Sequence, residues 1–158
     1  MTEMKPRLVQ AKPADVKAMY ALIRASAEAG QMLPRALSDI YECLRDFVLA
    51  LDPADGALVG CCALHVVWSD LAEVRSLTVR EDRRGLGLGR ALVERCLADA
   101  RALDLPRVFA LTYVPAFFHT LGFHDLDKAA LPHKVWSDCV RCHKYPDCDE
   151  LAVAIDFA

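Results

Sequence analysis

The sequence has no long hydrophobic run and no excess of positive charge. Its longest apolar stretch, residues 59–68, is too short to cross a bilayer, and residues 1–6 lack the apolar core of a signal peptide. We therefore expect a cytoplasmic protein that does not bind a membrane. Lysine and arginine number 19 against 22 aspartates and glutamates. This balance argues against a nucleic-acid partner, which usually requires a basic face, and favours a small-molecule substrate.

The sequence also lacks the two C-x-x-C motifs that are typical of a structural zinc site. Its seven cysteines are an odd number, and in a reducing compartment they do not form a disulfide framework. One C-x-x-C motif lies in a cluster of thiols and imidazoles. The candidate zinc ligands of this cluster are Cys139, Cys142, Cys148, His143 and His133. Zinc and a reduced thiol cluster both stay open, so we assign no metal site.

The length and the apolar pattern predict one α/β domain over residues 1–158, with a cysteine-containing loop at about 125–148. Hydrophobic residues make up 54% of the 158 residues, enough for a substantial core. The predicted strands are residues 7–12, 47–51, 58–68, 72–79, 107–112 and 149–157. The predicted helices run from 13 to about 30, from 34 to 46 and from 87 to 103. A helix separates strands 72–79 and 107–112, so these should be parallel in a mixed, mostly antiparallel sheet flanked by helices.

Two sets of apolar residues define the faces that these helices should bury. In helix 34–46 the expected stripe is Leu37, Ile40, Tyr41 and Leu44. In helix 87–103 the expected buried residues are Leu88, Ala91, Leu92, Cys96, Ala100 and Leu103. Four cysteines outside the cluster also lie in apolar patterns and are predicted core residues, namely Cys43, Cys61, Cys62 and Cys96.

Residues 83–89, with the sequence RRGLGLG, form a basic turn between a strand and a helix. Glycine occupies every second position, and without Cβ atoms the backbone N–H groups can approach an anion closely. The first N–H groups of the following helix and its dipole add to the attraction. Arg83 and Arg84 can supply charge-assisted hydrogen bonds. The turn therefore predicts a pyrophosphate site.

Two other phosphate-binding loops do not fit this turn. A nucleotide-hydrolase loop requires Gly-Lys-Ser/Thr, whereas Gly89 is followed by Arg90 and Ala91. A dinucleotide fingerprint requires a third glycine where Arg90 stands. The pattern that remains is R-x-x-G-x-G, formed by Arg84, Gly87 and Gly89.

This pattern, after a strand and opening a helix, resembles the acetyl-coenzyme A loop of the GNAT superfamily of N-acetyltransferases. Residues 116–123, AFFHTLGF, resemble the short helix and LGF turn near the C-terminus of that fold. The resemblance implies a GNAT-like sheet and acetyl-coenzyme A as co-substrate, and leaves a homodimer open. The implied cofactor-binding residues are Arg84, Gly85, Leu86, Gly87, Leu88, Gly89 and Arg90 for the diphosphate, and the main chain of Leu77 and Val79 for the pantetheine arm.

Acetyl transfer to an amine requires a base for the ammonium group and a proton for the leaving thiolate. Glu73 is the only carboxylate well inside strand 72–79, so it is the candidate base. Strict alternation would place Glu73, Arg75, Leu77 and Val79 on one face, although the bulge that is usual in the superfamily would change this. Where superfamily members often have a tyrosine acid, this sequence has Phe118, which cannot give a proton.

Four short segments resemble the acetyltransferase domain of N-acetylglutamate synthases, which begin arginine synthesis: residues 33–35 (LPR), 72–74 (AEV), 109–112 (FALT) and 117–118 (FF). This resemblance implies L-glutamate as acceptor, Glu73 as base, Thr112 as acid and Arg35 as a contact of the substrate carboxylate. Guanidinium groups suit a dicarboxylate, and Arg75 is a second candidate. Two alternatives stay open, namely another small amine or protein N-terminus as acceptor, and a non-catalytic coenzyme A-binding sensor.

Overall fold

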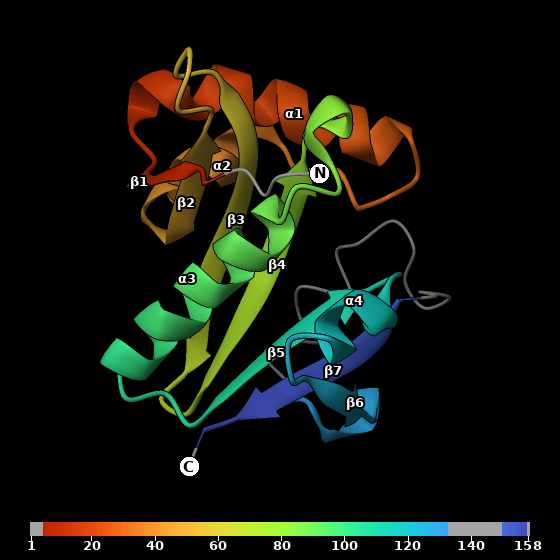
Figure 1. Ribbon diagram of the computed structural model, residues 1–158. Helices are drawn as coiled ribbons and strands as arrows, with labels where there is room; N and C mark the ends of the chain where they lie inside the picture. Colours follow the sequence, from red (N-terminus) through yellow and green to blue (C-terminus); the bar gives the residue numbers. More distant parts are fainter. Residues whose placement is uncertain (1–4, 133–149, 158) are drawn as a thin grey trace.

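In the computed structural model, residues 5–132 and 150–157 are described, and their strands form one sheet (Figure 1). The sheet order is β1-β2-β3-β4-β5-β7-β6. In chain order the strands are β1 Arg7–Gln10, β2 Phe47–Leu51, β3 Leu58–Trp68, β4 Leu71–Val79, β5 Arg107–Thr112, β6 His124–Leu126 and β7 Leu151–Asp156. Between these strands the β4–β5 pair is parallel and the others are antiparallel, which confirms the predicted mixed sheet.

Helices cover both faces of the sheet. Helices α1 Val16–Glu28 and α2 Leu37–Glu42 lie on one face, while α3 Leu88–Ala102 and α4 Pro115–His119 lie on the other (Figure 1). On the first face Val16, Met19 and Ile23 of α1 pack against Leu49 and Cys61. Each such fully buried aliphatic side chain contributes about 1.5–3 kcal/mol relative to exposure, so the two packed faces hold the sheet between its helices.

The structure changes the boundaries of the helix predicted over residues 34–46. Only α2 is α-helical there, and a 3-10 turn follows at Leu44–Asp46. Ile40 is buried as predicted, but Leu37 and Tyr41 are exposed. The stripe fails because the helix has six residues, which is too short to present four apolar positions to one surface.

The predicted face of α3 is largely confirmed, but Ala91 is only half-buried and the prediction is wrong for Leu103 at its end. Leu88, Leu92, Cys96 and Ala100 are buried. Leu103 is 59% exposed because the helix stops at Ala102 and the chain turns away. The other buried residues of this helix are Val93 and Leu97, which widen the apolar face beyond the predicted stripe.

Three of the four predicted core cysteines, Cys61, Cys62 and Cys96, are buried, and Cys43 is half-buried. Strand β6 forms at the start of the segment that was predicted as a cysteine-containing loop. The candidate zinc ligands at positions 133–148 lie outside the described residues. In the described part of the chain, none of the helices has the length and apolarity needed to span a membrane.

Candidate functional site

Strand β4 contains a bulge that changes the face on which its side chains lie. Cys61 pairs with Thr78 and Ala63 with Arg75, so β4 has one more residue than β3 over this stretch. Ser76, inside the extra stretch, has a φ of 57°, which is rare for a residue other than glycine. The bulge expected from the family resemblance is therefore confirmed.

The bulge places Glu73 and Leu77 on opposite faces of the sheet. Before it, Glu73 and Arg75 lie on the face covered by α1 and α2. After it, Leu77 and Val79 pack into the core under α3, while Thr78 forms a hydrogen bond with a side chain of α1. The expectation of one shared face for Glu73, Arg75, Leu77 and Val79 is therefore wrong, because the extra residue inverts the alternation.

Glu73 lies in a confined and electropositive position. Its side chain is 14% exposed, and its Oε1 is 3.7 Å from Nη1 of Arg75. Burial raises the pKa of Glu73 to about 7, while the charges of Arg75, Arg35 and His65 act in the opposite direction. A carboxylate with a pKa near neutrality is well matched to taking a proton at physiological pH.

The two predicted substrate-binding arginines come together beside Glu73. Arg35, in the segment before α2, donates from Nε to Ser76 Oγ at 3.2 Å. Burial and the neighbouring Arg75 both lower the pKa of Arg35, and Glu73 opposes this. Two cations thus adjoin one carboxylate in a largely buried setting. Such a pair can accept an anionic ligand, because an incoming carboxylate relieves their mutual repulsion.

Thr112 lies at the end of β5 and is buried. Its Oγ1 accepts a hydrogen bond from the Val114 N–H at 2.9 Å, a contact that does not use the hydroxyl proton. By strand alternation Thr112 faces the same side as Val108 and Ala110, under α3. Glu73 faces the other side of the sheet, so the two residues would meet only across the opening between β4 and β5.

Strands β4 and β5 pair only near their starts. Within these two described strands the pairs are Ala72 with Val108 and Glu73 with Phe109, and the strands then diverge (Figure 1). Among the described residues, the β5-facing edge of β4 from Arg75 to Val79 therefore has no strand partner. Exposed main-chain groups on such an edge can pair with an extended amide-containing ligand. The opening begins directly beside Glu73.

The glycine-rich turn has the conformation that its glycines permit. Gly85 and Gly87 have φ values of 77° and 83°, and Gly87 is the residue before α3. Gly89 has a different role, because a Cβ atom there would lie 3.3 Å from the ring of Phe117. The first N–H groups of α3 open onto this turn, as the sequence indicated.

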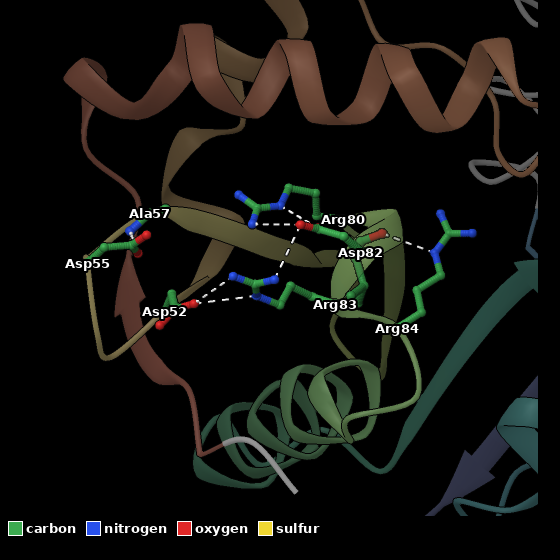
Figure 2. A network of polar contacts seen from close by, with 8 residues as sticks. Asp52, Asp55, Ala57, Arg80, Asp82, Arg83 and Arg84 are labelled. Carbon is green, nitrogen blue, oxygen red and sulfur yellow. Dashed lines mark hydrogen bonds and ion pairs between the residues drawn. The ribbon is translucent and has the colours of Figure 1, made fainter. Parts of the chain in front are cut away.

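Arginine side chains around the turn are held by the protein itself. Figure 2 shows Arg83 between two carboxylates, with Nη2 3.2 Å from Asp52 and Nη1 3.3 Å from Asp82. Arg84 donates from Nε to the Val79 carbonyl at 3.2 Å. Arg83 therefore ties the turn to the β2–β3 hairpin instead of pointing freely into solvent.

Two further arginine contacts link the turn to other parts of the chain. Arg84 Nη2 donates to Gln31 Oε1 at 2.6 Å, which joins the turn to the segment after α1. Arg90 donates from Nη2 to the Thr120 carbonyl at 3.3 Å, just after α4. The turn thus connects both helical layers, and its arginines are held by contacts within the protein.

A polar cluster that sequence reasoning missed lies beside Glu73. In Cys43, Asp46 and His65, the atoms that could bind a metal ion, namely a thiol sulfur, a carboxylate oxygen and a ring nitrogen, all lie within 4.8 Å of one another. His65 Nδ1 lies 2.6 Å from Asp46 Oδ2, and Arg75 Nη2 donates to Cys43 Sγ at 3.7 Å. These residues come from β3 and the segment after α2. The register of β3 on β4, which sets His65 opposite Glu73, would have been needed to find them.

Phe118 is a core residue. It is buried and makes edge-to-face contacts with Phe117 and Phe123, at centroid distances of 5.2 and 5.1 Å. The position therefore contributes packing of α4 against the sheet, in keeping with the absence of a proton donor there.

Comparison with known proteins places this arrangement in a family. The model of the acetyltransferase (GNAT) family matches residues 16–124. An N-acetyltransferase of Chlorobaculum tepidum, described as uncharacterised, is 38% identical over 143 residues, 90% of this chain and 91% of that protein. An amino-acid acetyltransferase of Mycobacterium tuberculosis is 36% identical over 143 residues, 89% of this chain and 81% of that protein.

Comparison with solved structures agrees with this family match. A Mycobacterium tuberculosis protein in complex with CoA and NLQ is 31% identical, with a TM-score of 0.83 over 97% of this chain and 100% of that chain. N-acetylglutamate synthase from Neisseria gonorrhoeae, complexed with coenzyme A and N-acetyl-glutamate, shares the fold with a TM-score of 0.85 at 24% identity. The alignment covers 99% of this chain and 36% of that chain. The family match over most of the sequence and these relatives show that the chain belongs to the acetyltransferase (GNAT) family.

Proposed function

We propose that this protein transfers the acetyl group of acetyl-coenzyme A to the amino group of a small amino acid, most specifically L-glutamate. Glu73 acts as the general base. The single observation that carries the proposal is the juxtaposition of Glu73 with Arg75 and Arg35 at the opening between β4 and β5. A base for the amine, cations for its carboxylates and an exposed strand edge for the cofactor then adjoin one another.

Features of the described residues fit coenzyme A. The turn at residues 84–90 offers backbone N–H groups at the start of a 15-residue helix, which suits a diphosphate. The β4 edge that contains Leu77 and Val79 offers main-chain groups for the amides of a pantetheine arm. Acetyl-coenzyme A supplies the acetyl group as a thioester, and the protein's own residues bind and orient it.

Glu73 performs the proton transfer that the reaction requires first. An amino acid carries an ammonium group at neutral pH, and this group is not nucleophilic until it loses a proton. With a pKa of about 7, Glu73 is partly ionised at neutral pH and still basic enough to accept that proton. A correctly placed base contributes about 10²- to 10⁴-fold in rate.

The arginines give the site its preference for an anionic acceptor. Arg35 and Arg75 adjoin Glu73, so a substrate carboxylate bound to them would hold the amine near the base. Two cations suit a dicarboxylate better than a polyamine, which they would repel. Thr112 is assigned the role of proton donor to the departing thiolate, or of a hydrogen bond to it.

The names of related proteins support this choice of acceptor. The Mycobacterium tuberculosis relative is named an amino-acid acetyltransferase, and the Neisseria gonorrhoeae structure contains N-acetyl-glutamate. On this proposal the product is N-acetylglutamate, the first intermediate of arginine synthesis, and the protein acts in the cytoplasm.

Acetylation assays with a panel of acceptors test the proposal. Purified protein would be incubated with acetyl-coenzyme A and L-glutamate, L-glutamine, L-aspartate, spermidine or a short peptide, and thiol release would be measured. Glutamate should give the highest kcat/KM. A higher kcat/KM for spermidine or the peptide would show that glutamate is not the preferred acceptor.

The variant Glu73→Gln separates an enzyme from a binding protein. It should reduce acetylation by about 10²-fold or more and leave coenzyme A binding, measured by calorimetry, unchanged. Binding of coenzyme A without acetylation of any acceptor by the unaltered protein would favour a coenzyme A-binding sensor.

A further inference from the structure

Acetyl transfer to an ammonium group releases one proton for each turnover. The ammonium group loses two protons when it becomes an amide, and the departing thiolate takes one of them. The second proton must reach solvent. Glu73 is the residue that holds it, and its side chain is only 14% exposed. A route from Glu73 to water is therefore a requirement of the proposed reaction.

His65 lies next to Glu73 on the adjacent strand of the sheet. The two residues are directly paired in the antiparallel β3–β4 ladder, and Cβ atoms of such pairs are about 5 Å apart on the same face. The charge of His65 also acts on Glu73. His65 is more exposed than Glu73, with 30% of its side chain accessible.

Asp46 fixes the orientation of the His65 ring. Its Oδ2 lies 2.6 Å from Nδ1 of His65, and 26% of its side chain is exposed. A carboxylate only accepts hydrogen bonds, so Nδ1 carries the hydrogen and Nε2 of the neutral ring is the basic nitrogen. This arrangement leaves one nitrogen of His65 ready to accept a proton.

We propose that the His65–Asp46 pair is the proton exit of this active site. The O–H bond of protonated Glu73 breaks as an N–H bond forms at Nε2 of His65, directly or through one water molecule. The imidazolium then gives the proton to solvent, and Asp46 stabilises it while it is charged. His65 acts through Glu73 and is therefore a positioning and relay residue. The inference rests on the proposed role of Glu73 as base.

The other charged groups around the pair agree with a relay rather than a metal site. Cys43 adjoins His65 and Asp46, but its Sγ accepts a hydrogen bond from Arg75. A guanidinium cation beside this thiol disfavours a metal cation at the same sulfur. Arg35 and Glu150 also act on Glu73, with opposite signs. These groups remain in place in the variants proposed below.

The experiment compares His65→Gln and Asp46→Asn with the unaltered protein. Glutamine keeps a hydrogen-bonding group of similar size but cannot carry a proton. A loss of about 10- to 100-fold in kcat is expected for His65→Gln, the range that is typical when a residue hydrogen-bonded to a metal ligand is replaced. Coenzyme A affinity should stay unchanged. Asp46→Asn should also lower kcat, because it removes the negative charge that stabilises the imidazolium form of His65.

The matched control is His124→Gln. His124 also contacts an aspartate, with Nε2 3.0 Å from Asp156 Oδ2, but it lies on β6 at the far edge of the sheet. The control should keep the kcat of the unaltered protein, so any loss specific to His65 is not a general effect of removing a histidine–aspartate contact.

Two readouts distinguish a relay from a merely structural role. In dilute buffer, imidazole should restore kcat of His65→Gln in proportion to its concentration and leave the unaltered protein unaffected. The acidic limb of the kcat/KM profile should also move to higher pH in His65→Gln, because the charge of the protonated His65 ring lowers the pKa of Glu73 and the variant lacks this charge.

Several outcomes would overturn the inference. One is a His65→Gln protein with normal kcat and pH profile in dilute buffer, and another is a loss of kcat that imidazole does not restore. A zinc ion found in purified protein and released by Cys43→Ser would assign the cluster to a metal. If Glu73→Gln were fully active, the role of Glu73 as base, on which the relay rests, would fail, whereas an inactive Glu73→Gln beside an unaffected His65→Gln would remove the relay alone.

Discussion

Arg35 donates a hydrogen bond from Nε to Oγ of Ser76, at 3.2 Å, and Ser76 is the residue of the β4 bulge with a φ of 57°. The contact joins the segment before α2 to the point where β4 changes face. The bulge therefore links two parts of the proposed site. Through Ser76, β4 holds Arg35 beside Arg75 and Glu73, and the same strand borders the proposed cofactor site.

Substitutions of Ser76 test this link. Ser76→Ala keeps the unfavourable φ and removes the acceptor, so it should lower the free energy of unfolding by about 1 kcal/mol and raise KM for the amino acid. Ser76→Gly removes the acceptor but relieves the backbone, so its stability should be higher than that of Ser76→Ala. Urea unfolding and steady-state kinetics provide the two measurements.

Asp104→Gly is a matched control for Ser76→Gly. Asp104 also has a positive φ, of 60°, but lies just after α3 and away from Arg35. It should gain stability with no change in KM. An unchanged KM in both Ser76 variants would show that Ser76 does not position Arg35.

Replacement of Arg35 by lysine should weaken amino-acid binding. Lysine keeps the charge but loses the planar fork that can bind a carboxylate with two hydrogen bonds. KM for glutamate should rise by about 10- to 100-fold, which corresponds to the loss of one charge-assisted hydrogen bond. The dissociation constant of coenzyme A should stay the same.

Arg24→Lys serves as the control for Arg35→Lys. Arg24 is on the exposed side of α1, where it pairs with Glu28 one turn away. It should leave KM unchanged. A KM for glutamate that does not respond to Arg35→Lys would place the substrate carboxylate elsewhere.

The sequence predicted the elements of this fold well because its apolar patterns are regular and its helix-forming and turn residues agree with them. The strands at 47–51, 58–68 and 107–112 match the structure to the residue. The glycine-rich turn was also recognisable, since positive φ values at Gly85 and Gly87 require the residue type found there. Local signals therefore sufficed to predict the conformation of this turn.

The arrangement around Glu73, the proposed acceptor site, was harder to predict because it depends on strand register. The bulge at Ser76 inverts the alternation of β4, and no residue type marks it, since serine is not a usual residue at a positive φ. The pairing of His65 with Glu73 likewise depends on how β3 meets β4. Neither relationship is encoded in spacing along the chain.

Gly85→Ala should weaken cofactor binding. Gly85 has a φ of 77° with open space around its Cβ position, so alanine would cost about 1–2 kcal/mol in the left-handed region without a clash. If the turn relaxes to avoid this strain, its N–H groups no longer converge, and the affinity for coenzyme A should fall by about fivefold or more. Calorimetric titration with coenzyme A measures the effect.

Gly56→Ala provides the comparison for Gly85→Ala. Gly56 lies in the β2–β3 hairpin with a φ of 73°, and its Cβ position is equally open. The two variants should lose similar amounts of stability, but only Gly85→Ala should change the affinity. Equal affinities for coenzyme A would place the diphosphate away from this turn.

Replacement of Glu73 by glutamine should stabilise the fold at neutral pH while it lowers the rate of acetylation. The pKa of Glu73 is raised from 4.5 to about 7 by burial. Below pH 4.5 the residue is protonated in both the folded and the unfolded state. As the pH rises toward 7, the unfolded chain loses this proton and the folded chain retains it, so the free energy of unfolding falls.

Glutamine has no such titration, and the difference between the two proteins isolates the effect of Glu73. The variant should gain up to about 3 kcal/mol relative to the unaltered protein between pH 4.5 and pH 7, with little further gain above pH 8. Urea unfolding of both proteins at pH 5, 6, 7 and 8 measures this gain. A difference that stays constant with pH would mean that Glu73 ionises in the folded protein as it does in water. Its pKa would then not be raised by burial, and this prediction would be wrong.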